Sequence, residues 1–122
     1  MVIVANAFSL SMVPNGADIS CYLIDIEEVN YELRHRIYDD GEEFKSIVGH
    51  ADTAAVYSNL LDMDIPYNRE TFVVPSNEST VMFVGQLIGG RLPEGATTLP
   101  EGYKIQWMEV IIDPYYPTSV DI

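Results

Sequence analysis

The segment Y-K-I-Q-W-M-E-V-I-I, Tyr103–Ile112, carries the strongest strand signal in the chain. Apolar residues occupy both faces of its carboxyl-terminal half, a pattern typical of a strand that is covered on both sides. We therefore expect this segment to lie in the centre of a sheet. Val2–Ala5 is a shorter apolar run of the same kind, and the more polar segment Asn6–Met12 follows it.

Apolar periodicity predicts the remaining elements. Three further segments are expected to be strands: Ile19–Ile26, Thr71–Pro75 and Thr80–Leu87. The polar turn between the last two predicts a β-hairpin. Helices are expected at Glu27–Tyr38 and at His50–Asp62, where apolar side chains recur at helical spacing. The short segment Glu43–Val48 fits neither pattern clearly.

This order of elements predicts one small α+β domain, residues 1–113, in which helices cover one face of a mixed β-sheet. Residues 114–122 contain two prolines and are predicted to be a C-terminal tail. The length of 122 residues and the apolar fraction of 48% are typical of a single globular domain with its own core.

Composition excludes several classes of protein. The one cysteine, Cys21, cannot form an internal disulfide, which fits a reducing compartment. No apolar run approaches the ~20 residues that span a bilayer, and the N-terminus lacks the basic leader of a signal peptide. We therefore expect a soluble, cytoplasmic protein that does not enter membranes. The formal charge of −13 would repel long nucleic acids but allows a small anion in a local pocket.

The usual metal and nucleotide motifs are missing from the sequence. It contains neither His-x-His nor His-x-x-x-His, and one cysteine cannot build a structural zinc site. Neither a Walker loop nor a Rossmann glycine pattern occurs. We therefore expect no bound metal and no cofactor, so that any chemistry must come from ordinary side chains.

His50 is the main candidate for acid–base chemistry. It stands at the expected start of the second helix, where free backbone N–H groups beside Gly49 form a potential anion site. An imidazole can donate or accept a proton near neutral pH. The alternative is equally concrete: if the helix begins earlier, His50 joins the apolar stripe beside Ala54 and Tyr57. Taken alone, the pattern around His50 favours this packed position.

Two candidate partners follow Thr80–Leu87. Arg91 comes directly after a Gly-Gly pair, and its guanidinium suits bidentate phosphate binding, although a weak surface ion pair is the alternative. Glu94 is placed to orient a histidine, but it also fits an acidic turn residue. Glu101, in a second copy of L-P-E-G, illustrates this ambiguity.

Four motifs, taken in order, resemble a known family. They are A-N-A-F-S (Ala5–Ser9), G-H-A-D-T-A (Gly49–Ala54), Y-N-R (Tyr67–Arg69) and R-L-P-E-G (Arg91–Gly95). The ordered set resembles the viral ring nucleases that act as anti-CRISPR proteins, and the resemblance covers nearly the whole chain. It implies a small α+β fold that forms a symmetric homodimer around cyclic tetraadenylate, the second messenger of type III CRISPR defence.

The resemblance also implies an activity and a set of site residues. The implied activity is metal-independent cleavage of the ring into linear products with 2′,3′-cyclic phosphate ends, which would silence the defence from within the host cytoplasm. His50, Arg91 and Glu94 match the family's catalytic residues. The positions implied to bind the ligand are Asn6, Ser9, Gly49, Arg69 and Gln86. The first L-P-E-G copy is the one matched, because only this copy follows an arginine.

Two other functions remain open from the sequence. The first is a non-catalytic sponge that binds the cyclic oligonucleotide and releases it intact. The second is an acidic interaction protein that mimics nucleic acid, which the charge of −13 favours.

Overall fold

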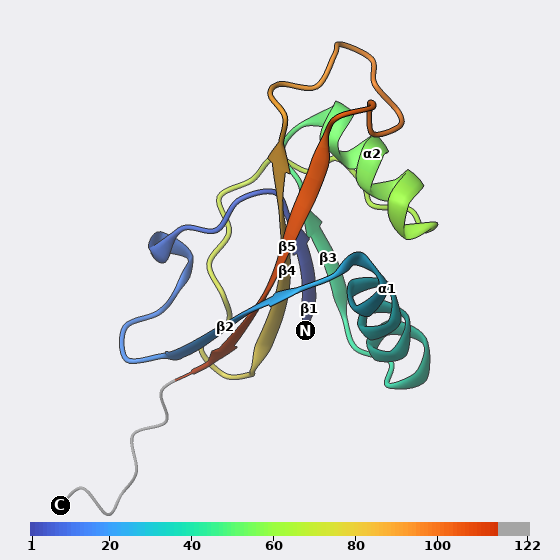
Figure 1. The fold of residues 1–122 in the computed structure, drawn as a ribbon. Coiled ribbons are helices and arrows are strands. Elements are labelled where there is room, and N and C mark those ends of the chain that lie inside the picture. Colours follow the sequence, from blue (N-terminus) through green and yellow to red (C-terminus); the bar gives the residue numbers. More distant parts are fainter. Residues whose placement is uncertain (115–122) are drawn as a thin grey trace, which may run out of the picture.

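Strand β1 (Val2–Ala5) is buried along its whole length, because strands flank it on both sides and side chains cover both of its faces. The structure, a computed structural model, describes residues 1–114. Five strands form one mixed sheet in the order β2-β5-β4-β1-β3 (Figure 1). The other four strands are β2 (Asp18–Ile24), β3 (Phe44–Ile47), β4 (Thr80–Ile88) and β5 (Lys104–Asp113).

Strand direction determines where loops gather. β1 pairs in parallel with β3 and with β4, whereas β5 runs antiparallel to both β4 and β2. The carboxyl ends of β1, β3 and β4 therefore meet at one edge of the sheet, which is the upper end in Figure 1.

Helices α1 (Ile26–Arg34) and α2 (Ala51–Leu61) pack on one face of the sheet (Figure 1). Asp25 begins α1 by accepting a hydrogen bond from the backbone N–H of Glu28 at 2.8 Å. A π-helical turn, His35–Asp39, continues α1. The core between helices and sheet includes Val4, Val29, Leu33, Tyr57, Phe83 and Trp107. The prediction of an α+β domain with helices on one face of a mixed sheet is confirmed.

The other face of the sheet is covered by two irregular segments instead of helices. Phe8 and Met12 come from the first segment, and Phe72 and Val74 from the second. The backbone N–H of Val74 donates to the carbonyl oxygen of Met12 at 2.7 Å. The predicted strand Thr71–Pro75, and with it the hairpin, is therefore wrong: alternate side chains are buried, but the segment pairs with a loop and not with the sheet.

Three other expectations are affected. β5 is not the central strand, since it lies second from the edge, and β4 holds the centre. The ambiguous segment Glu43–Val48 contains β3, which forms the edge of the sheet beside β1. The tail predicted at residues 114–122 lies outside the described residues, apart from the buried Pro114.

A buried hydrogen bond ties α2 to β4. Tyr57 is 1% exposed, and its hydroxyl donates to the carbonyl oxygen of Gly85 at 2.9 Å. A Cβ atom at position 85 would overlap that hydroxyl, so only glycine allows this approach. Burial raises the pKa of Tyr57 far above its usual value, so the hydroxyl remains a donor. The two elements that carry opposite walls of the site described below are thus fixed to each other.

Replacement of Glu109, on β5, is expected to change the stability of the fold measurably. Burial raises the pKa of its carboxyl group, Glu32 and Glu28 raise it further, and Arg36 partly opposes them. The pKa of Glu109 is higher in the folded state than in the unfolded state. Its ionisation therefore lowers the free energy of unfolding as the pH rises from the unfolded-state pKa through the folded-state pKa. Solvent screens part of this effect, so Glu109→Gln is expected to increase the free energy of unfolding at pH 7 by only about 0.5–1 kcal/mol, or roughly 2–5 °C in Tm.

The origin of this gain can be checked by thermal unfolding at two pH values. Below about pH 4 the wild-type carboxyl is also neutral, so the difference between the two proteins should disappear. Glu101→Gln, at an exposed turn, is the control and should leave Tm unchanged at both pH values. A gain of equal size at low pH would mean that the introduced amide packs better than the carboxyl group, and the electrostatic explanation would be wrong.

Candidate functional site

The candidate site lies at the edge where β1, β3 and β4 end. Asn6 directly follows β1, Gly49 and His50 lie between β3 and α2, and Arg91 and Glu94 lie in the loop after β4. Residues far apart in the sequence are therefore delivered to one place by the parallel pairing of three strands.

His50 is the N-cap residue of α2. Its backbone is extended (φ −134°, ψ 129°), and its carbonyl oxygen accepts the first helical hydrogen bond from the N–H of Ala54 at 3.0 Å. The imidazole makes no capping hydrogen bond, and the residue is exposed. His50 therefore does not join the buried stripe of α2, and the packed alternative is wrong.

A cavity of about 670 Å³ brings the three predicted catalytic residues together. Its lining residues are His50, Asp52, Thr53, Leu87, Arg91, Leu92 and Glu94. This volume is in the range of ordinary ligand sites. Glu101, the matching residue in the second L-P-E-G copy, is exposed in a turn and does not line it. The structure thus distinguishes two glutamates that have the same sequence context.

Three of the predicted ligand-binding residues adjoin this cavity through Gly49. The backbone N–H of Gly49 donates to the side-chain oxygen Oδ1 of Asn6 at 3.1 Å. On its other side, Cγ of Arg69 lies 3.6 Å from the point that a Cβ on Gly49 would occupy. Asn6 and Arg69 therefore flank the turn that leads into His50.

The other two predicted ligand-binding residues, Ser9 and Gln86, do not line the cavity. The Ser9 hydroxyl accepts from the N–H of Ser11 at 3.3 Å and caps the short 3-10 helix Leu10–Met12. Gln86 is exposed and lies directly across from Gln106 on β5. Since neighbouring side chains of a strand alternate, Gln86 faces the side of the sheet opposite to the cavity residue Leu87.

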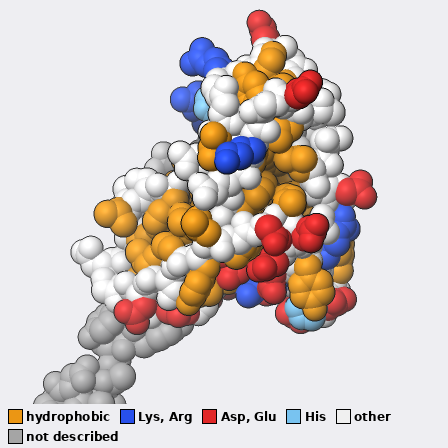
Figure 2. Space-filling model, in the orientation of Figure 1, with side chains coloured by type: hydrophobic (Ala, Val, Ile, Leu, Met, Phe, Trp, Pro, Cys, Tyr) orange, Lys and Arg blue, Asp and Glu red, His pale blue; other side chains and the backbone are white. Residues whose placement is uncertain are grey.

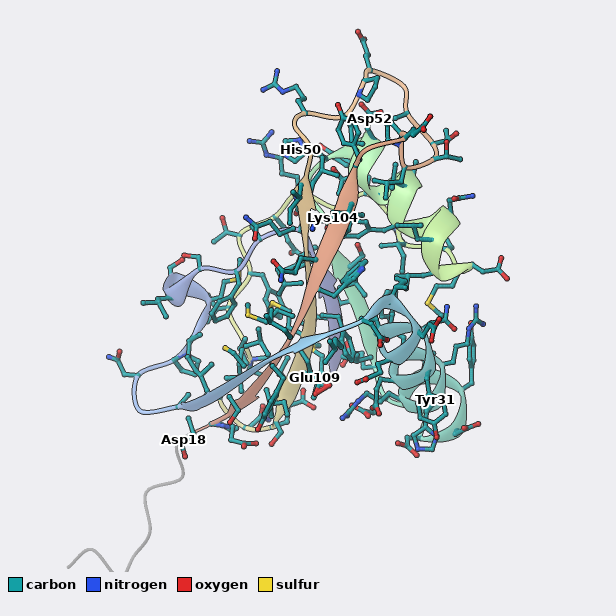
Figure 3. All side chains as sticks on the ribbon, viewed as in Figure 1. Asp18, Tyr31, His50, Asp52, Lys104 and Glu109 are labelled. Atoms are coloured by element: carbon teal, nitrogen blue, oxygen red, sulfur yellow. The ribbon has the colours of Figure 1, made fainter. Side chains whose placement is uncertain are left out.

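Sequence reasoning assigned no role to the other four residues of the cavity wall, which are Asp52, Thr53, Leu87 and Leu92. Asp52 and Thr53 follow His50 closely within the motif G-H-A-D-T-A, so the motif itself could have indicated that they lie at the same site. Figure 3 shows His50 and Asp52 close together at the upper end of the molecule. Leu87 had no signal of its own, because its direction depends on the register of β4.

The basic side chains divide into two groups. Arg36 pairs with Glu32 and Glu42, Lys45 pairs with Glu70 at 2.7 Å, and Arg34 donates to the carbonyl oxygens of Leu61 and Asp62 at the end of α2. The remaining three make no ion pair within residues 1–114: Arg69, Arg91 and Lys104. Figure 2 shows basic side chains beside a histidine at the upper end, where some acidic ones also lie, and further acidic side chains in the lower part. Of these three, Arg91 lines the cavity and Arg69 adjoins it beside Gly49, whereas Lys104 lines a separate pocket.

Two absences concern only the described part of the chain. Within residues 1–114, no three His, Cys, Asp or Glu side chains are grouped so that they could hold a metal ion. None of the helices in this part combines the length and apolar character that crossing a membrane requires.

The fold and site define a small α+β protein with a cavity at one edge of its sheet that is lined by a histidine, an arginine and two carboxylates. The model of the STIV B116-like family matches residues 2–105, and the chain belongs to this family. It is 28% identical over 117 residues to "Uncharacterized protein 26" of Sulfolobus islandicus filamentous virus (isolate Iceland/Hveragerdi), covering 91% of this chain and 92% of that protein. The solved structure of B116 of Sulfolobus turreted icosahedral virus is similar, with a TM-score of 0.68 and 25% identity over 89% of this chain and 97% of that one.

Proposed function

We propose that this protein is a metal-independent ring nuclease that binds cyclic tetraadenylate and cleaves it to linear products with 2′,3′-cyclic phosphate ends. The observation that carries the proposal is the cavity in which exposed His50, at the start of α2, meets Arg91 and Glu94. These are the three residues to which the family resemblance gives catalytic roles. Acting in the host cytoplasm, such an enzyme would switch off type III CRISPR signalling.

The reaction needs no external nucleophile. A ribose 2′-OH of the ring attacks the adjacent phosphorus, the new 2′-O–P bond closes a cyclic phosphate, and the bond from phosphorus to the 5′-oxygen breaks. The 2′-OH loses its proton to solvent, and the departing 5′-oxygen must receive one. The protein's task is therefore to align these atoms, stabilise the charge on the phosphoryl oxygens and supply a proton.

The cavity residues suit these tasks. Protonated His50 is the donor to the leaving 5′-oxygen, because its imidazole is free of capping bonds. The Arg91 guanidinium and the N-terminus of α2 stabilise the phosphoryl charge, since both present N–H donors. Glu94 lines the same cavity and is proposed to orient the His50 ring. No step in this scheme requires a metal ion.

The distribution of charge supports an anionic ligand despite the net charge of −13. Two cations that make no ion pair within residues 1–114 lie at the candidate site: Arg91 lines the cavity, and Arg69 adjoins it beside Gly49. A tetra-anionic ring would meet these cations first, whereas the acidic side chains of α1 lie away from the cavity (Figure 2).

We propose that the ring is held by a symmetric homodimer. Each chain contributes one His50, Arg91 and Glu94 set to its own cavity, and a two-fold axis would present two sets to opposite phosphates of a four-fold repeating ring. Asn6, Gly49 and Arg69, which adjoin the cavity, are proposed to contact the ligand in this assembly, whereas contacts of Ser9 and Gln86 stay predictions from the resemblance alone.

Incubation of the protein with labelled cyclic tetraadenylate in EDTA tests this function. Linear products with 2′,3′-cyclic phosphate ends are expected, and chromatography of the products identifies them. Ring that is retained by the protein but recovered intact would identify a sponge and contradict the enzyme. Absence of both binding and cleavage would reject any cyclic-oligonucleotide function and favour an acidic interaction protein.

A further inference from the structure

The loop between β4 and β5, residues 89–103, carries two of the proposed catalytic residues and is restrained at two points, one at its own last residue and one on α2. The first anchor is Tyr103. Its hydroxyl donates to the carbonyl oxygen of Arg91 at 3.1 Å. Its ring lies so close to Gly89 that a Cβ there would be 3.0 Å from it, and Gly89 has a φ of +128° that favours glycine.

The second anchor joins the loop to the helix that follows His50. The backbone N–H of Gly95 donates to the carboxylate oxygen Oδ1 of Asp52 at 3.2 Å. Asp52 lies in the first turn of α2, two residues after His50, and its side chain also lines the cavity. The loop is thus fixed to the same helical turn that presents the imidazole.

We infer that Asp52 and Tyr103 are positioning residues that hold Arg91 and Glu94 opposite His50; this inference rests on the proposed function. The two hydrogen bonds fix the backbone at Arg91 and at Gly95, the two ends of the segment that carries both side chains. A segment fixed at both ends has fewer conformations, so less ordering is needed when a ligand binds.

The positioning role of Asp52 can be distinguished from an effect of its charge. A carboxylate in the wall of a cavity for a polyanion repels the ligand, so its charge does not help binding. A negative charge in the first helical turn does stabilise a helix, which is the competing explanation for an aspartate at this position. Asparagine separates the two roles, because Asp52→Asn keeps the oxygen that accepts from Gly95 but removes the charge. Asp52→Ala removes both.

Limited trypsin digestion measures the anchoring without any assay of activity. Trypsin cleaves the Arg91–Leu92 bond within the loop, and cleavage of Lys45–Ser46, in the edge strand β3, is the reference for opening elsewhere in the fold. Relative to that reference, Asp52→Ala and Tyr103→Phe should each speed cleavage after Arg91 by about three- to ten-fold. Asp52→Asn should stay within about two-fold of the wild type.

Ring cleavage by the same variants measures the consequence. Asp52→Ala is expected to lower kcat for cyclic tetraadenylate by about ten-fold, with Asp52→Asn restoring most of it. The inference is overturned if Asp52→Asn behaves like Asp52→Ala, because the effect would then come from the charge. It is also overturned if neither Asp52→Ala nor Tyr103→Phe speeds cleavage after Arg91. If the wild type itself cleaves no ring, the proposed function fails, and the trypsin rates still decide whether Asp52 and Tyr103 hold the loop.

Discussion

Replacement of His50 by alanine is expected to lower the rate of cyclic tetraadenylate cleavage by about 10²–10⁴-fold while the ring still binds. The imidazole is the proposed proton donor to the leaving 5′-oxygen, and this transfer matters in the transition state more than in the bound ground state. The expected result is therefore a loss in kcat with little change in affinity, measured by single-turnover cleavage and by equilibrium binding of labelled ring.

The chain provides a matched control for this experiment in its second histidine. His35 stacks on Tyr31 with ring centroids 5.9 Å apart, and its Nδ1 lies 2.9 Å from an Asp39 carboxylate oxygen. That hydrogen bond, together with the charge of Asp40, raises the pKa of His35. His35 lies on the π-helical turn after α1, and Figure 3 places Tyr31 at the opposite end of the molecule from His50. His35→Ala should leave cleavage unchanged, and equal losses in both variants would remove His50 from the mechanism.

Replacement of Arg91 by alanine is expected to affect both binding and rate. Loss of the guanidinium removes a phosphate contact in the bound ring and a donor to the phosphoryl oxygens in the transition state. We expect Kd to rise by at least about ten-fold and kcat to fall by about 10²–10³-fold. Arg91→Lys keeps the charge but not the planar pair of donors, so it should recover more of the affinity than of the rate.

Lys45→Ala is the control for charge alone in this series. It also removes one positive charge, but Lys45 is already paired with Glu70, and it lies on β3 over the ring of Phe72. Its Kd for the ring should stay within about two-fold of the wild type. If Arg91→Ala and Lys45→Ala weakened binding equally, long-range charge would explain the effect, and the proposed contact of Arg91 with phosphate would be wrong.

The sequence predicts the elements whose apolar pattern matches their final burial. Val2–Ala5 is a continuous apolar run, and the carboxyl-terminal half of Tyr103–Ile112 is apolar on both faces; these segments become β1 and most of β5. The segment Thr71–Pro75 shows the limit of this reasoning. Alternating apolar side chains indicate that one face of a segment is buried. A loop that packs on the surface of a sheet shows this pattern as well as a strand does. Pairing partners are not encoded in the alternation itself.

The sequence predicted which residues form the candidate site better than it predicted how these residues are arranged. The ordered motifs identified His50, Arg91 and Glu94, and the structure places all three at one cavity. The packed alternative for His50 required α2 to begin about one turn earlier, and sequence propensity does not fix the first residue of a helix. The contacts of Asp52 and Tyr103 with the loop were also invisible, because each joins positions 12 or more residues apart.

The hydrogen bond between Tyr57 and Gly85 has a consequence for how the protein loses activity on heating. The bond lies in the main core beside Trp107, so it cannot open without exposing that core to water. The helix that begins after His50 and the strand that leads to Arg91 therefore cannot drift apart while the domain stays folded. The relative position of α2 and β4 at the site should consequently be lost on heating only when the domain itself unfolds.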